Sequence, residues 1–122
     1  MTQKSYSIAH AESSLGWGGQ EIRIYTEMVA MRNRGHRLWL FAPAQSTIFA
    51  RCREAGFQVF PFSVHKAFYP LTVLRLAAAF RKEKVQVVNP HSSRDGWLVG
   101  MAARLARVPL VIRSRHFDVD YP

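Results

Sequence analysis

Short apolar runs alternate along the chain with longer segments in which apolar residues recur at helical spacing. The short runs predict buried strands at residues 6–11, 38–41, 57–62, 85–88 and 110–112. The longer segments predict helices at residues 20–34, 48–55, 70–84 and 94–107. Gly35 and Gly56 follow two of these helices, where a left-handed C-cap favours glycine, and Pro70 suits a first helical turn.

This alternation of strand and helix predicts an α/β fold. Short, continuously apolar strands are typical of a parallel sheet that helices cover on both faces. We therefore expect a Rossmann-like, three-layer α/β/α arrangement around a five-stranded parallel sheet in the order 3-2-1-4-5, with right-handed crossovers. Two helices carry an apolar stripe that should face the sheet. The stripes comprise Ile22, Tyr25 and Val29, with Ile24, Met28 and Met31 beside them, and Trp97, Leu98, Met101, Ala102 and Leu105.

The composition is that of a folded globular chain. The 122 residues are 48% apolar and 20% charged, and this length suits one domain that buries a core without staples. The single cysteine, Cys52, cannot form an internal disulfide, and we expect a half-buried structural thiol. The apolar stretch at residues 71–80 is too short to cross a bilayer and contains Arg75, so a cytoplasmic protein is expected.

The net charge is strongly positive. Lys and Arg number 17 against 8 Asp and Glu, which gives +9 and attracts polyanions such as nucleic acid, phosphorylated small molecules or an anionic membrane. The basic residues are scattered along the chain, which argues against a disordered nucleic-acid-binding arm. Solvated helix faces in an arginine-rich chain are an equally simple explanation.

Candidate chemistry lies in three turns that the predicted topology brings together. In open parallel sheets, ligands bind beyond the C-terminal ends of the strands, where the strand order reverses. With the order 3-2-1-4-5 this place lies between strands one and four, beside the turns at residues 13–19, 89–95 and 113–118. We expect a binding cleft there.

The first of these turns is rich in glycine. Gly16, Gly18 and Gly19 precede a helix, and a helix N-terminus beside small residues favours an anion such as phosphate. The dinucleotide pattern G-x-G-x-x-G is absent because Glu21 stands at its last position, and no Walker motif occurs. The alternative is a turn that only permits tight packing of helix on strand.

The other two turns carry histidine and arginine. Ser92 or Ser93 can cap the following helix, but His91 and Arg94 are less easily explained in this way. An imidazole at a strand end can act as an acid or a base, and a guanidinium binds phosphate or carboxylate. His116 follows the fifth strand and should face the same cleft, with a surface histidine as the alternative. No cluster of His and Cys has the spacing of a zinc site.

Four stretches resemble the N-terminal domain of glycosyltransferases of the two-Rossmann-domain (GT-B) architecture and family 4 type. They are residues 12–21 (ESSLGWGGQE), 34–36 (RGH), 87–95 (VVNPHSSRD) and 113–116 (RSRH). The resemblance runs over nearly the whole chain. It is greatest to bacterial enzymes that build lipopolysaccharide or other cell-surface glycans.

This resemblance implies retaining transfer of a sugar from a nucleotide-sugar to a glycan or lipid-linked acceptor, without a metal ion or other cofactor. In the family the glycine-rich turn lies against the donor, here Gly18 and Gly19. The histidine after strand five lies near the transferred sugar, which makes His116 the expected catalytic residue. His91 and Arg94 would line the acceptor side, and nucleic acid is not an expected partner.

The family also implies a second domain that this sequence does not contain. That domain binds the nucleotide and carries a characteristic pair of glutamates, which the five glutamates here do not form. We therefore expect residues 1–122 to be an incomplete N-terminal Rossmann-like domain, catalytically incompetent or very weak on its own.

The helix at residues 70–84 suggests an anionic membrane surface as a further candidate partner. Basic residues beside exposed aromatics can dock on anionic lipid, here at the inner face of the plasma membrane. The alternative is that the apolar residues of this helix pack on the sheet. Docking on lipid would involve Lys66, Phe68, Tyr69, Arg75, Arg81, Lys82 and Lys84. Packing on the sheet would involve Leu71, Leu74 and Ala78.

Two other classes of protein compete with the transferase. One is a non-enzymatic, basic Rossmann-like module that binds nucleic acid or a partner protein through its helices, and the other is a flavodoxin-like nucleotide binder. A cleft that gathers Gly18, Gly19, His91 and His116 would favour the transferase.

Overall fold

The computed structural model describes residues 5–63, 68–91 and 93–112, without the side chains of residues 93–95. The elements follow in the order β1 (Ser7–Ala11), α1 (Gly19–Asn33), β2 (Arg37–Ala42), α2 (Thr47–Glu54), β3 (Gln58–Pro61), α3 (Tyr69–Lys82), β4 (Val87–Pro90), α4 (Ser93–Ala106) and β5 (Leu110–Val111). Every predicted element is present, and the ends of each observed helix or strand lie within two residues of the predicted ends.

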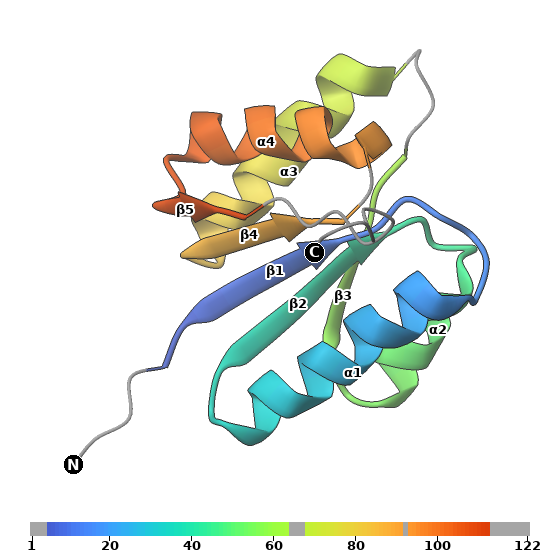
Figure 1. Ribbon diagram of the computed structural model, residues 1–122. Coiled ribbons are helices and arrows are strands. Elements are labelled where there is room, and N and C mark those ends of the chain that lie inside the picture. The colour runs from blue at the N-terminus through green and yellow to red at the C-terminus, as the bar shows by residue number, and fades with distance from the viewer. Residues whose placement is uncertain (1–4, 64–67, 92, 113–122) are drawn as a thin grey trace, which may run out of the picture.

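The strands form one parallel sheet in the order β3-β2-β1-β4-β5, as predicted (Figure 1). The strand β1 lies between β2 and β4, with Ile8 paired to Leu38 on one side and to Val87 on the other. All five residues of β1 are buried, because the strand has neighbours at both edges and helices on both faces. The C-terminal ends of β1 and β4 therefore lie side by side.

Helices cover both faces of the sheet and make two cores. In Figure 1, α1 and α2 lie on one face, and α3 and α4 lie on the other. Successive side chains of β2 alternate between them: Leu38 and Leu40 join the core under α1 and α2, and Trp39 and Phe41 join the core under α3 and α4. Phe41 also packs edge-to-face on Phe80, with ring centroids 5.0 Å apart. The predicted three-layer α/β/α fold is confirmed.

The two glycine C-caps are also confirmed. Gly35 follows α1 at φ +94°, and Gly56 follows α2 at φ +91°, a backbone region that side-chain-bearing residues rarely adopt. Cys52 in α2 is fully buried, not half-buried, and burial raises the pKa of its thiol to about 12. A thiol in that state is a structural side chain and not a nucleophile.

The prediction for the buried face of α4 is wrong in part. Leu98 and Ala102 are buried as expected, but Trp97, Met101 and Leu105 are 46%, 50% and 52% exposed. The helix is rotated so that small residues, among them Ala103, lie in the core that it shares with α3. Small side chains let α4 approach α3 closely, whereas the larger side chains of Trp97, Met101 and Leu105 would hold the two helices apart.

Two further apolar assignments are corrected. In α1, Ile24 and Met28 are buried, but Ile22 is 45% exposed. In α3, the suggestion that Leu71, Leu74 and Ala78 pack on the sheet is wrong, because all three are exposed. The side chains of α3 that face inward are instead those of Thr72, Val73, Leu76, Ala79 and Phe80.

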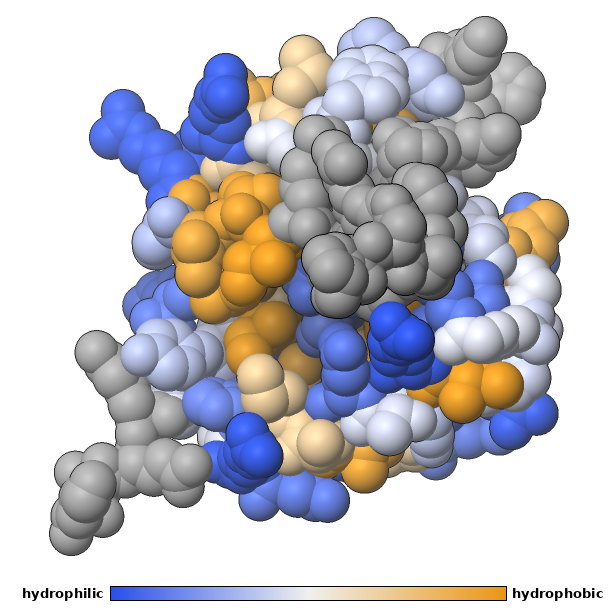
Figure 2. Space-filling view, viewed as in Figure 1, coloured by the Kyte–Doolittle hydropathy of each residue, from blue (hydrophilic) through white to orange (hydrophobic). Residues whose placement is uncertain are grey.

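Part of the apolar surface follows the edge of the sheet. Figure 2 shows hydrophobic surface gathered where β5 lies in Figure 1. The side chains of Leu110, Val111 and Ile112 are 50%, 38% and 43% exposed. Of the helices in the described ranges, none is both long enough and apolar enough to cross a bilayer.

Candidate functional site

The loop between β1 and α1 lies at the C-terminal edge of the sheet, where the order of the strands reverses. Gly18 is the N-cap of α1, and Gly19 is its first residue. His91 follows β4 directly, and its backbone N–H donates to the carbonyl of Ala11 at 3.0 Å. The structure therefore places the glycine loop and His91 after adjacent strands, as the sequence predicts.

The two remaining candidates are only partly described. Arg94 lies in the first turn of α4, on the same edge of the sheet, but its side chain is not described. His116 lies outside the described residues. That Gly19 and His116 lie close together at the same cleft therefore stays a prediction.

Two glutamates that flank the glycine loop hold it in place. The Glu12 carboxylate accepts a hydrogen bond from the Ser14 backbone N–H at 2.9 Å and another from the Gln20 side chain. The Glu21 carboxylate accepts from the Gly18 N–H at 2.8 Å and from the Ser14 hydroxyl. Both glutamates are buried, and together they fold the loop back onto the start of α1.

These contacts move the two carboxyl pKa values in opposite directions. Burial raises the pKa of Glu12 above its ordinary 4.5, and hydrogen bonds from Ser14 and Gln20 offset only part of this. Burial would also raise the pKa of Glu21, but the hydrogen bonds from Ser14 and Gly18 outweigh it and lower that pKa. The loop thus holds one carboxyl that resists ionisation and one that favours it.

The raised pKa of Glu12 predicts a dependence of stability on pH. The folded chain holds the Glu12 proton more tightly than the unfolded chain, so this group stabilises fully below pH 4.5 and loses its contribution as the pH rises through the raised pKa. We expect the free energy of unfolding of Glu12→Gln to gain on that of the wild type as the pH rises from 4.5 through the raised pKa. Urea unfolding across this range measures the difference.

The matched control for this prediction is Glu54→Gln, which removes an exposed carboxylate at the end of α2. Its stability curve should run parallel to that of the wild type over the same range. A Glu12→Gln curve that also runs parallel to the wild type would show that Glu12 keeps an ordinary pKa.

The glycines of the loop leave open space in front of α1. A Cβ added to Gly19 or Gly16 would meet no atom within 4 Å, whereas one added to Gly18 would lie 3.4 Å from a carboxylate oxygen of Glu21. Packing of helix on strand therefore does not explain why Gly19 lacks a side chain. A bound group that approaches the helix N-terminus would explain it.

A second histidine lies against His91. His10 Nδ1 and His91 Nε2 are 2.7 Å apart, a hydrogen bond in which one ring donates and the other accepts. The rings are nearly parallel, at 13°, and the residues are only 4% and 2% exposed. His91 is thus held by a strand residue that the sequence pattern assigned to the core of β1.

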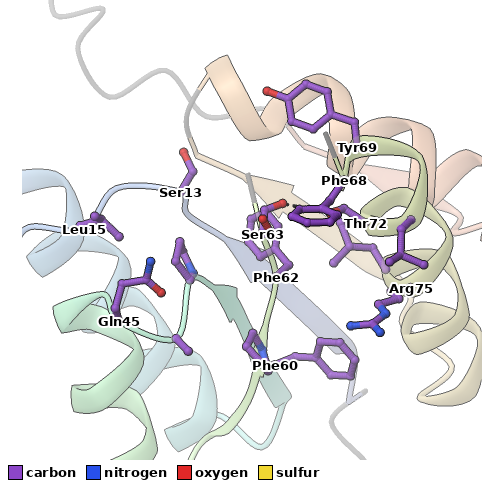
Figure 3. A pocket seen from close by; sticks show the side chains of 15 residues that line it. Ser13, Leu15, Gln45, Phe60, Phe62, Ser63, Phe68, Tyr69, Thr72 and Arg75 are labelled. Atoms are coloured by element: carbon purple, nitrogen blue, oxygen red, sulfur yellow. Dashed lines mark hydrogen bonds between the residues drawn. The ribbon is translucent and has the colours of Figure 1, made fainter. Parts of the chain in front are cut away.

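A cavity of about 1100 Å³ lies beside the glycine loop, not on top of the β1–β4 junction (Figure 3). Its walls come from the ends of β2 and β3, from the start of α3 and, through Ser13 and Leu15, from the loop itself. None of Gly18, Gly19 and His91 lines this cavity, so the predicted cleft between β1 and β4 is a separate place and stays a prediction.

The lining of this cavity is mostly apolar. Figure 3 shows Phe60 and Phe62 on one side and Phe68 on the other, with the Arg75 side chain reaching in from α3. The Thr72 hydroxyl donates to the carbonyl of residue 63 at 3.1 Å, which ties α3 to the segment after β3. Among the described lining residues, Arg75 is the charged one. The cavity can take an apolar group that carries a negative charge.

Sequence reasoning missed three residues of this region. His10 is expected only as part of a strand and Glu12 only as part of the motif, although an acid directly after a buried strand indicates a buried polar contact. Arg75 was interpreted as part of a basic surface. The place of Arg75 in the cavity depends on which face α3 turns toward the sheet, and a single sequence does not specify that face.

Known proteins are similar to this chain in sequence pattern and in fold. The model of Glycosyltransferase Family 4 matches residues 17–121. The chain belongs to this glycosyltransferase family. Among curated protein sequences none matches the chain.

Solved structures of glycosyltransferases share the fold. A glycosyltransferase from Rickettsia africae superposes with a TM-score of 0.77 at 16% identity, over 93% of this chain and 30% of its own. MurG from Acinetobacter baumannii gives 0.66 at 14% identity, over 88% and 35%. HepE from Anabaena, solved with UDP and glucose, gives 0.68 at 15% identity, over 86% and 28%. This family 4 chain thus spans about a third of the length of each, and the likeness shows a GT-B-type Rossmann-like fold.

Proposed function

We propose that this family 4 chain is the N-terminal part of a retaining glycosyltransferase that moves a sugar from a nucleotide-sugar to a cell-surface glycan or lipid-linked acceptor. The observation that carries the proposal is the open space before Gly19, at the N-terminus of a 15-residue helix and at the reversal of the strand order. Membership of the family supports a sugar as the transferred group, and the open space before Gly19 supports a donor bound there.

The donor would bind against the start of α1. The first N–H groups of a helix have no partner within the helix, and the helix dipole favours a phosphate there. The buried Glu21 carboxylate is already bonded to Gly18 and Ser14, so it does not occupy the open side at Gly19. A UDP-sugar is the first donor to test, because HepE has been solved with UDP-glucose.

The acceptor would lie across the mouth of the cavity. The aromatic walls would bury an apolar portion such as the lipid of a lipid-linked acceptor, and Arg75 would pair with its phosphate. His91 and Arg94 are proposed to line the acceptor side, and His116 to lie near the transferred sugar. No metal or cofactor is needed for this chemistry, and residues 1–122 alone are expected to be inactive or very weak.

The donor part of the proposal can be tested on the chain as it stands. Titration of the ¹⁵N-labelled 122-residue chain with UDP-glucose should shift the amide signals of Gly18, Gly19 and the first turn of α1. Inorganic pyrophosphate is the charge control, because a chain of net charge +9 attracts any polyanion. Shifts spread over the basic helices, and equal for both ligands, would contradict donor binding at Gly19.

A transfer assay tests the expected incompetence of the chain. Incubation with radiolabelled UDP-glucose and a lipid-linked acceptor should give no robust transfer. Robust turnover by residues 1–122 would contradict the expectation that these residues form an incomplete domain.

The exposed face of α3 and α4 favours a second role, docking on an anionic membrane. Between the helices lies an apolar groove of about 360 Å³ whose walls include Leu74, Trp97 and Met101. These side chains are 46–61% exposed, and Arg81 and Lys82 are exposed on the same helix as Leu74. An apolar groove beside cations fits a lipid surface, each cation adding about 1 kcal/mol near anionic lipid.

Vesicle flotation tests this docking. We expect the chain to float with vesicles that contain phosphatidylglycerol, to float less at high salt, and to lose most binding in the Leu74→Glu/Trp97→Glu double variant. Ile22→Glu, on the exposed side of α1, is the matched control and should float like the wild type. Flotation that does not depend on anionic lipid would contradict the proposal.

A further inference from the structure

Three side chains with metal-ligand atoms converge between β1, α1 and the end of β4. They are His10, Glu27 and His91, and one ligand atom from each lies within 4.8 Å of the other two. The residues come from positions far apart in the sequence, so no spacing pattern could have indicated them. The proposed transfer chemistry gives no role to His10 or Glu27, and it uses His91 only as a side chain that lines the acceptor side.

The two imidazoles of this cluster are held in place before any ion arrives. Both histidines are almost fully buried, and their facing ring nitrogens are 2.7 Å apart. The hydrogen bond between them needs one proton, which an ion that binds both nitrogens would replace. Glu27 is exposed, so its carboxylate can complete the ligand set from the solvent side.

We propose that His10, His91 and Glu27 form a binding site for a divalent transition-metal ion of the zinc type. Two imidazole nitrogens and one carboxylate oxygen suit Zn²⁺ or Co²⁺, whereas Mg²⁺ and Ca²⁺ prefer oxygen ligands alone. With Zn–N bonds of about 2.0–2.1 Å, the two nitrogens of a tetrahedral site lie about 3.3 Å apart. The histidine pair therefore needs to open by only about 0.6 Å.

The ion would join the helix to the sheet. Glu27 lies on α1, His10 on β1 and His91 directly after β4, so one ion would fix the helix that begins at Gly19 relative to both strands. Three protein ligands also leave a fourth position for water or for an oxygen of a bound molecule. The site goes beyond the proposed function, because that transfer chemistry needs no metal.

Isothermal titration calorimetry and thermal unfolding test the site on the purified 122-residue chain. We expect ZnCl₂ to bind one ion per chain and to raise the midpoint of thermal unfolding, and MgCl₂ to do neither. CoCl₂ should give the visible absorption of a four-coordinate Co²⁺ ion, which reports the ligand geometry directly.

Variants separate this site from other zinc binding. Glu27→Gln changes an exposed side chain and leaves the folded core intact, and it should weaken zinc binding at least about tenfold, since even outer partners of metal ligands are worth about 10–100-fold. His10→Gln should abolish the one-to-one binding and the Co²⁺ spectrum. His36→Gln is the matched control: it removes an imidazole that stacks on Tyr6, and it should bind zinc like the wild type.

Two results would overturn the proposal. One is the absence of saturable, one-to-one binding of Zn²⁺ or Co²⁺ by the wild-type chain. The other is zinc binding that Glu27→Gln leaves unchanged, because the ion would then be held elsewhere. In both cases the histidine pair is a hydrogen-bonded structural contact, and the donor titration with UDP-glucose is unaffected.

Discussion

Replacing Leu76 with alanine is expected to lower the free energy of unfolding by about 2–5 kcal/mol. Leu76 is fully buried at the middle of α3, in the core that α3 and α4 share with the sheet. The truncated side chain leaves a cavity that its neighbours cannot fill, and this cost adds to the lost burial of apolar surface. Since a domain of this kind is stabilised by about 5–15 kcal/mol, the loss is a large fraction of the total.

The matched control is Leu74→Ala, two residues earlier on the same helix. Leu74 is 61% exposed, so its truncation should change stability by no more than about 0.5 kcal/mol. Urea unfolding followed by circular dichroism measures both variants. Equal losses at Leu74 and Leu76 would contradict the rotation of α3 described above.

The second large effect is expected at Gly19, and it concerns binding rather than stability. If the donor binds against the start of α1, Gly19→Leu should weaken UDP-glucose binding at least about tenfold, or about 1.4 kcal/mol, because the side chain fills the open space. The free energy of unfolding should hold or rise slightly, because no atom lies within 4 Å of the new Cβ and leucine favours a helix more than glycine does.

Gly100→Ala is the control that separates an effect on UDP-glucose binding from an effect on stability. Gly100 lies within α4, and a Cβ added there also meets nothing within 4 Å. This variant should raise stability by about 0.5–1 kcal/mol and bind UDP-glucose like the wild type. The titration and thermal unfolding report the two properties independently. Wild-type affinity in Gly19→Leu would place the donor elsewhere.

The topology of the sheet could be predicted from the sequence because its signals are local and agree with one another. Each strand is a short apolar run, and Gly35 and Gly56 mark helix ends that the structure confirms at positive φ. Strict alternation of strand and helix then leaves few arrangements, and the order 3-2-1-4-5 is among the commonest.

The faces of the helices could not be predicted with the same success. In α4, the stripe that contains Trp97 and Met101 and the stripe that contains Leu98 and Ala102 both have helical spacing. Which of the two stripes is buried depends on how closely α4 packs on α3. The close contact between these helices favours the stripe that contains Ala102. Hydrophobicity alone favours the larger side chains, which the structure leaves exposed.

The placement of the glycine loop beside His91 could be predicted from the sequence, but the residues that support these two could not. The glycine loop and His91 follow adjacent strands because parallel strands bring their C-terminal ends together. The burial of His10 and Glu12, and the cavity beside Arg75, depend on side-chain packing between distant elements. Such packing has no signature within a single stretch of sequence.

The central place of β1 has a consequence for the synthesis of the chain. Its neighbour β4 comes much later in the chain, with Ile8 paired to Val87, so β1 cannot complete its pairing until β4 has left the ribosome. Contacts between such distant residues slow folding, and a nascent chain that has reached only β3 shows an apolar strand with one free edge. Protection by a chaperone, or a pause in translation, would be of greatest value before residue 90 is made.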